Sequence, residues 1–176
     1  FEEDPSPVVS YNTGRLFFDA GTTNHKLGAV SGEGEFQLFF SQTSDIPTFD
    51  QSNTDLGQFV NEPNSIWNVS HEGSGGTGNI AEMPSFPSEF PNLRITASGA
   101  TNAADKSYGS GSNDINVIRF NNDIVVNESF TVGNKAAYLM GGDIQIGGDL
   151  QVGMGYGYGS FYFPNDANAY EVEVTG

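Results

Sequence analysis

The chain has 176 residues, of which 36% are hydrophobic and only 16% charged, and it combines 23 glycines with 14 phenylalanines and 7 tyrosines. This length suits one domain with a real core, and the glycine-rich, aromatic-rich mixture is typical of all-β proteins and not of helical enzymes. The net charge of −16 excludes nucleic acid as a partner and disfavours an anionic membrane surface, because both need clustered Lys and Arg. The absence of cysteine excludes disulfides, cysteine catalysis and the commonest zinc sites. No apolar run is long enough to predict membrane insertion.

In chain order, strand-like runs at 15–18 and 35–40 flank a turn-rich stretch. Residues 41–91 hold five of the eight prolines and the sequence GSGGTGN, so this segment is predicted to be irregular and loop-rich, with only short strands. A second loop is predicted at 101–114. Regular coils are expected over 92–176, within a single domain that spans 1–176.

The clearest pattern is a repeat. FNNDIVVNESFTVG, residues 120–133, aligns with MGGDIQIGGDLQVG, residues 140–153, so that Ile124 matches Ile144 and the apolar residues at 124, 126, 130 and 132 recur at 144, 146, 150 and 152. Within each copy the apolar residues lie two apart, which is the spacing of a strand with one buried face. Turn-forming residues separate the paired apolar positions, so each copy predicts a strand, a corner and a strand.

Two such units, each too small to bury its own apolar face, predict successive coils of an all-β, parallel β-solenoid. The coils are expected to be right-handed, because parallel crossover connections almost always are. An antiparallel β-sandwich built from hairpins is the alternative, since the Gly-Gly-Asp corner could also form a tight turn. The solenoid predicts a core of Leu93, Ile95, Val117 or Ile118, Phe120, Ile124, Val126, Phe130, Val132, Ile144, Ile146, Leu150 and Val152.

A looser similarity links the two ends of the chain. Residues 161–163 resemble 16–18, and residues 170–176 resemble 25–32. This similarity predicts a larger period of about 145 residues, in which the chain would be a fragment of a longer repeat array.

The search for chemistry gives few candidates. His25 and His71 lie in polar, turn-like contexts without metal-binding spacing, so both are predicted to be surface histidines without partners. Asp123 and Asp143, one coil apart, would lie about 5 Å from each other. They are a candidate calcium site; a catalytic carboxylate pair and hydrated turn aspartates are the alternatives. No catalytic residue and no other cofactor is predicted.

Tyr156 and Tyr158 alternate with glycines, and Tyr162 follows them. These three tyrosines are a candidate strip for stacking sugar rings. The alternative is an ordinary strand at the edge of the solenoid, where glycines allow another backbone to approach closely.

The phrases EFPNLRI, LFFDAGTTNHKLGAVSGEGEF and the D-I-x-I-x-x-x-L-x-V-G coils resemble the repeat regions of large Bacteroidota cell-surface, adhesin-type proteins exported by the type IX secretion system. This resemblance implies a secreted, non-enzymatic structural or adhesive segment at the bacterial cell surface. It implies neighbouring repeats, surface glycans or the secretion machinery as partners. The alternative function is a carbohydrate-binding or polysaccharide-active β-helix, in which acid pairs and Arg94 or Arg119 would converge in a cleft.

Overall fold

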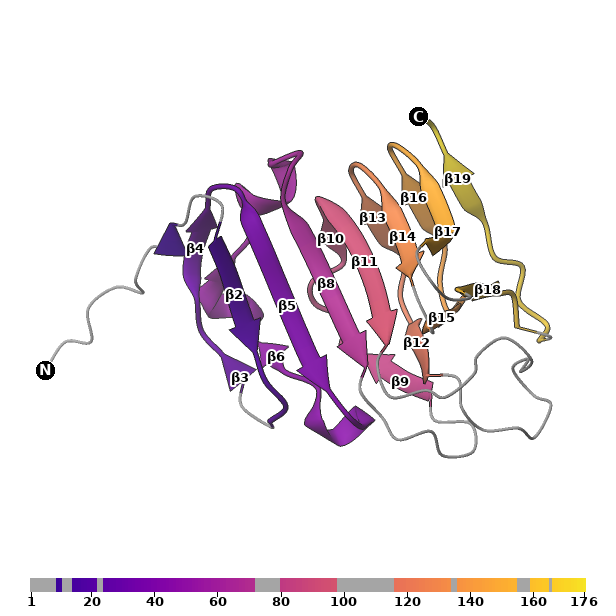
Figure 1. The fold of residues 1–176 in the computed structure, drawn as a ribbon, viewed down its shortest axis with the longest axis horizontal. Coiled ribbons are helices and arrows are strands. Elements are labelled where there is room, and N and C mark those ends of the chain that lie inside the picture. The colour runs from indigo at the N-terminus through magenta and orange to yellow at the C-terminus, as the bar shows by residue number, and fades with distance from the viewer. Residues whose placement is uncertain are drawn as a thin grey trace, which may run out of the picture.

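The computed structural model describes residues 9–10, 14–21, 24–71, 80–97, 116–133, 136–154, 159–164 and 166–176. Paired strands throughout these segments run parallel to each other, and the chain forms a right-handed parallel β-helix (Figure 1). The expected fold class is therefore confirmed, and the antiparallel sandwich is not what forms.

Three faces make up the β-helix. The long sheet contains β2 (Gly14–Phe18), β5 (Gly34–Phe40), β8 (Ile66–His71), β11 (Asn92–Ala97), β14 (Phe130–Gly133) and β17 (Leu150–Met154). The second sheet contains β9 (Ile80–Met83), β12 (Asn116–Phe120), β15 (Ala136–Leu139) and β18 (Ser160–Tyr162). The third sheet contains β10 (Glu89–Phe90), β13 (Ile124–Val126), β16 (Ile144–Ile146) and β19 (Val172–Val174).

Smaller sheets continue the second and third faces toward the N-terminus. One pairs β3 (Asn24–His25) with β6 (Thr48–Phe49), and the other contains β1 (Val9–Ser10), β4 (Gly28–Ser31) and β7 (Thr54–Asp55). The 3-10 turns are η1 (Thr43–Asp45), η2 (Gln51–Asn53) and η3 (Phe59–Asn61). Residues 41–91 therefore carry η1 to η3 and strands β6 to β10, with the prolines in the connections between them.

Each coil takes one strand from each face, as β14, β15 and β16 do, and successive coils stack from the N-terminal to the C-terminal end (Figure 1). Ile124 pairs with Ile144, and Phe130 pairs with Leu150, so both halves of the predicted repeat stack in register. The repeat ends in a bulge, because Gly133 pairs with Met154 instead of Gly153.

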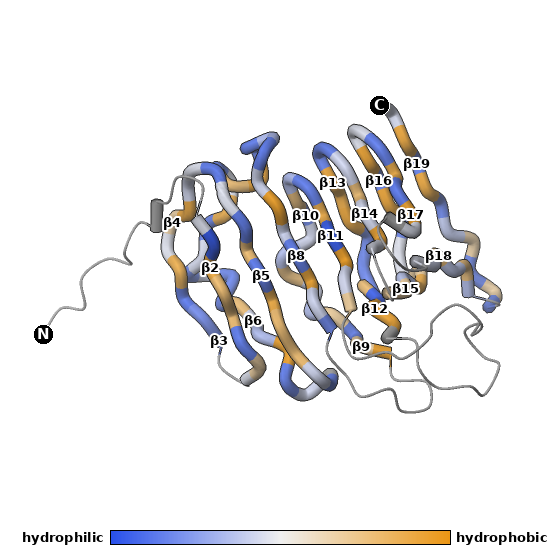
Figure 2. The backbone as a smooth tube through the Cα atoms, viewed as in Figure 1, coloured by the Kyte–Doolittle hydropathy of each residue, from blue (hydrophilic) through white to orange (hydrophobic). Residues whose placement is uncertain are grey.

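The core lies between the three faces and is formed by inward rows of stacked side chains. In the long sheet one row runs Phe36, Trp67, Leu93, Phe130, and the Phe36 and Trp67 rings stack 4.8 Å apart. Hydrophobic and hydrophilic residues alternate along these strands in Figure 2. The predicted core residues are buried with two exceptions, and Ile118 belongs to the main core while Val117 joins a separate apolar cluster.

Val152 is the first exception, because its side chain is 44% exposed. Its row partner Val132 is fully buried. The difference arises because β17 is the last strand of the long sheet, so no described strand covers its far side. Leu150, on the same strand, is half-buried for the same reason.

The similarity between residues 161–163 and 16–18 does not mark equivalent positions. Phe161 and Tyr162 lie in β18 of the second sheet, whereas Leu16 and Phe17 lie in β2 of the long sheet. The alignment therefore places strands from different faces on one another, because short aromatic runs suit any face of the helix.

Candidate functional site

Asp123 and Asp143 form a ladder at the corner before the third sheet. Oδ1 of Asp123 accepts a hydrogen bond of 2.9 Å from the backbone N–H of Asp143. Oδ1 of Asp143 accepts one of 2.9 Å from the backbone N–H of Glu171. The ladder therefore joins three consecutive coils.

These contacts match the turn role better than catalysis. The two aspartates are stacked along the helix axis and both are exposed, and each places one oxygen on a backbone amide of the next coil. Among the described residues, no group of three or more His, Cys, Asp and Glu side chains is placed to hold a metal ion. Calcium binding at Asp123 and Asp143 stays a prediction.

Tyr162 lies on the outward side of the second sheet. It packs, half-buried, against the apolar cluster of Val117, Ala137 and Leu139. Tyr156 and Tyr158 lie outside the described residues. The sugar-stacking strip stays a prediction, and Tyr162 is partly engaged in packing.

The prediction for the histidines is wrong at His71 and incomplete at His25. His71 is only 1% exposed; its ring stacks on Phe40 at 5.2 Å, and Nε2 lies 3.2 Å from the Ser41 carbonyl oxygen. Burial lowers the pKa of His71, and the Ser41 carbonyl offsets part of that shift. His25 is half-buried against the rings of Phe18 and Phe49. The sequence did not predict the burial of either ring, because the polar residues beside each histidine indicated an exposed turn.

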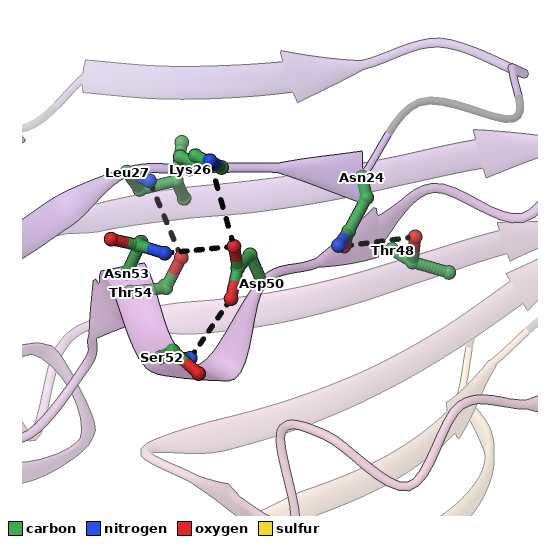
Figure 3. A network of polar contacts seen from close by, with 8 residues as sticks. All are labelled: Asn24, Lys26, Leu27, Thr48, Asp50, Ser52, Asn53 and Thr54. Carbon is green, nitrogen blue, oxygen red and sulfur yellow. Dashed lines mark hydrogen bonds and ion pairs between the residues drawn. The ribbon is translucent and has the colours of Figure 1, made fainter.

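A polar network around Asp50 connects the first two coils (Figure 3). Asn53 Nδ2 donates to Asp50 Oδ2 at 2.8 Å, and the Ser52 backbone N–H donates to Oδ1 at 3.0 Å. Lys26 lies 3.9 Å from the same carboxylate. The hydrogen bond from Asn53 lowers the pKa of Asp50, as do the smaller effects of Ser52 and Lys26. All of these groups are engaged with one another, so the network stabilises a corner.

A groove of about 410 Å³ opens where the third face is interrupted. It is lined by the region of β7 and by Phe86 to Glu89, and β7 and β10 are the end strands of separate sheets there. Its two carboxylates are engaged by the chain itself. Asp55 accepts from the Gly57 N–H at 2.9 Å, and Glu89 accepts from Asn127 Nδ2 at 3.2 Å.

Part of the outer surface of the long sheet lacks the acidic residues that are common elsewhere in the chain. One outward row runs in register through Gln37, Asn68, Arg94, Thr131 and Gln151. The outward residues of β8, β11, β14 and β17 include no aspartate or glutamate, although the chain has 22 acidic residues.

Arg94 lies in a second groove on this surface, with a volume of about 260 Å³. The groove is lined by Pro63, Asn64, Ile66, Asn92, Leu93, Arg94, Ser129 and Thr131. No carboxylate lines it, so Arg94 does not converge with an acid pair as a polysaccharide-active site would require. Sequence reasoning considered Arg94 but missed its neighbours, which come from three separate coils.

Fold and grooves together define a parallel β-helix protein whose longest sheet has no aspartate or glutamate at the outward positions of β8, β11, β14 and β17. No match was found among protein-family models, curated proteins or solved structures. Across the described part of the chain, no helix has the length and hydropathy needed to cross a bilayer.

Proposed function

We propose that this chain is a non-enzymatic structural segment that lengthens a bacterial cell-surface protein by stacking β-helical coils end to end. The observation that carries the proposal is the apolar C-terminal end of the core. Val152 and Val174 are 44% and 46% exposed there, whereas Val132 and Ile146, their partners in the preceding coil, are buried.

All three faces end together at this surface. β17, β18 and β19 are the last strands of the long, second and third sheets, respectively. Each therefore offers one row of backbone groups for parallel pairing, beside side chains that continue the core rows. A neighbouring repeat with the same strand and corner pattern would satisfy the backbone and bury the apolar side chains at once.

The positions of the acidic residues support a structural role over catalysis. Asp123 and Asp143 accept hydrogen bonds from backbone amides of the next coil. The Arg94 groove contains no carboxylate to act as an acid or a base. Export by the type IX system and a surface location rest on the resemblance to Bacteroidota repeat regions and belong to the same proposal.

Self-association tests the end surface. In sedimentation velocity the chain should form larger species as its concentration rises, because exposed core rows of two molecules can bury each other. The double variant Val152→Lys with Val174→Lys should stay monomeric. Lysine at these positions would place charges between the stacked rows, where they would be buried without partners.

Val125→Lys is the matched control. Val125 is 37% exposed, but it points outward from β13 between the coils of the third sheet. This variant should associate as the unaltered chain does. A chain that stays monomeric at every concentration, or one whose association survives the double substitution, would contradict the proposal.

A further inference from the structure

Arg94 is a cation inside a groove, and none of the described residues is its partner. It is half-buried, and it forms no ion pair or hydrogen bond with any described residue. On the same face, Arg15 is paired with Glu35 at 2.9 Å, and near the first corner Lys26 lies 3.9 Å from Asp50. Arg94 thus differs from these two cations, because no carboxylate in the described part of the chain forms an ion pair with it.

The surroundings of Arg94 favour an anion from outside the chain. Its neighbours across the sheet are Asn68 on one side and Thr131 on the other, and both are uncharged. In a chain with a net charge of −16, the lining of this groove carries a cation and no carboxylate. The carboxylates of Glu33 and Glu35 are already engaged by Asn64 and Asn68. The groove is therefore a place where an anionic group meets less repulsion than elsewhere on an acidic chain.

The groove also has hydrogen-bonding groups on a backbone that the side chain of Asn92 holds in place. Asn92 Nδ2 donates to the carbonyl oxygens of Pro63 and Ser65 at 2.8 Å, and its Oδ1 accepts from the Ser129 N–H at 3.1 Å. This amide therefore fixes three adjacent coils relative to one another. Ser129 and Thr131 line the groove, and their hydroxyls have no hydrogen-bond partner among the described residues.

We propose that the Arg94 groove binds an acidic sugar unit, with the Arg94 guanidinium on its carboxylate or sulfate and the hydroxyls of Ser129 and Thr131 on its ring oxygens. A guanidinium pairs with a planar carboxylate or a sulfate through two parallel hydrogen bonds. The volume of about 260 Å³ suits one ring and not a folded partner. The groove lies on the outer surface of the long sheet, so adjacent sugar units of a chain can continue along the outward row.

The site binds this ligand without cleaving it. None of the lining residues is an aspartate, a glutamate or a histidine, so the groove has no side chain suited to transfer a proton at neutral pH. The inference goes beyond the structural role, because coil stacking at the C-terminal end and ligand binding at the long sheet use different surfaces.

Calorimetric titration with defined probes tests the site. Trigalacturonic acid or a sulfated galactan trisaccharide should bind, and the fully methyl-esterified trigalacturonate should not, because it has the same rings without the charge. Arg94→Gln should weaken binding of the acidic probe by about tenfold or more, which is the usual effect of losing a charge-assisted hydrogen bond. Inorganic sulfate and a triglutamate peptide are included to separate an acidic sugar from any anion.

Arg15→Gln is the matched control, since it removes one arginine from the same sheet face at a position already paired with Glu35. It should leave affinity unchanged, and circular dichroism should confirm that both variants fold. Equal binding of the esterified trisaccharide, equal binding of triglutamate, no binding of either acidic sugar, or an unaffected Arg94→Gln would each overturn the proposal. The Val152 and Val174 variants should bind normally, so failure here is distinguishable from failure of the stacking proposal.

Discussion

Asp123 and Asp143 lie one coil apart, and the side chain of the first accepts the backbone N–H of the second at 2.9 Å. Asp143 repeats the contact with Glu171. A carboxylate from each of these two coils thus satisfies an amide at the corner of the next coil, much as an N-cap residue satisfies an orphan amide of a helix.

Asp143→Ala should lower the free energy of unfolding by about 1 kcal/mol, because the Glu171 amide loses its acceptor. Asp143→Asn should retain most of the stability, since the amide Oδ1 accepts the same hydrogen bond. Urea unfolding of the three proteins measures the difference. Equal losses in both variants would show that the charge and not the hydrogen bond matters.

Calcium gives the same pair a second test. If the aspartates serve only the corner, millimolar calcium should leave the unfolding midpoint of the chain unchanged. A calcium-dependent rise in the midpoint that disappears in Asp143→Asn would instead establish the metal site. Removing one charge from the pair weakens the binding of a divalent ion, whereas the asparagine can still accept the hydrogen bond.

Gly147→Ala should destabilise the chain by about 1–3 kcal/mol, as overpacking does. A methyl group at Gly147 would overlap the carbonyl oxygen of Asn127 in the preceding coil, and that backbone is held between its own neighbours. Gly21→Ala is the control, since no described atom would lie closer to its added methyl than the Asp19 oxygen at 3.9 Å. Gly147→Ala should unfold at a clearly lower temperature than Gly21→Ala. Similar midpoints would mean that the corner backbone shifts to accommodate the added methyl group.

His71 predicts a pH dependence. Burial lowers its pKa in the folded chain below the unfolded value of 6.5, so the unfolded chain binds a proton more readily as pH falls through that value. Stability should be complete above about pH 6.5 and should then fall with pH by at most about 1.4 kcal/mol per unit, until the folded pKa is reached.

Urea unfolding between pH 7.5 and pH 5.5 measures this slope. The range lies above the pKa values of ordinary carboxylates, so their titration contributes little to it. His71→Phe keeps an aromatic ring against Phe40 and should remove most of the slope. A slope of equal size in the variant would assign the pH dependence to other groups.

Tyr138→Phe should leave stability unchanged or raise it by about 1 kcal/mol. The Tyr138 side chain is fully buried, and its hydroxyl has no hydrogen-bond partner among the described residues, which costs free energy in a core. Burial also raises the pKa of this hydroxyl far above its usual range. A clear loss of stability in the phenylalanine variant would show that the hydroxyl is in fact satisfied.

Sequence patterns predicted the regular coils well because both requirements of a parallel β-helix are local. Alternation at Ile124 and Val126 selects one buried face, and the recurrence at Ile144 and Ile146 fixes which residue stacks on which. The same reasoning failed at Val152, whose pattern is identical to that of Val132, because burial there depends on whether another strand covers it.

The Arg94 groove was beyond local patterns for a related reason. Asn64, Arg94 and Thr131 belong to three coils of unequal length, separated by connections that no periodicity describes. The outward positions of β8, β11, β14 and β17 lack acidic residues, and this can be read from the sequence of each strand. It indicates a shared surface only when those strands are known to be neighbours.

The sequence by itself determined that the chain would be all-β, that Ile124 would pair with Ile144, and which residues would turn the corners. The first and last follow from spacing within each strand and its flanking turns, and the pairing follows from the recurrence of the pattern twenty residues later. Only the tertiary structure decided that His71 points into the core and that Arg94 faces an acid-free groove. Stacking brings together residues from different coils, and the environment of a charge depends on those neighbours in space.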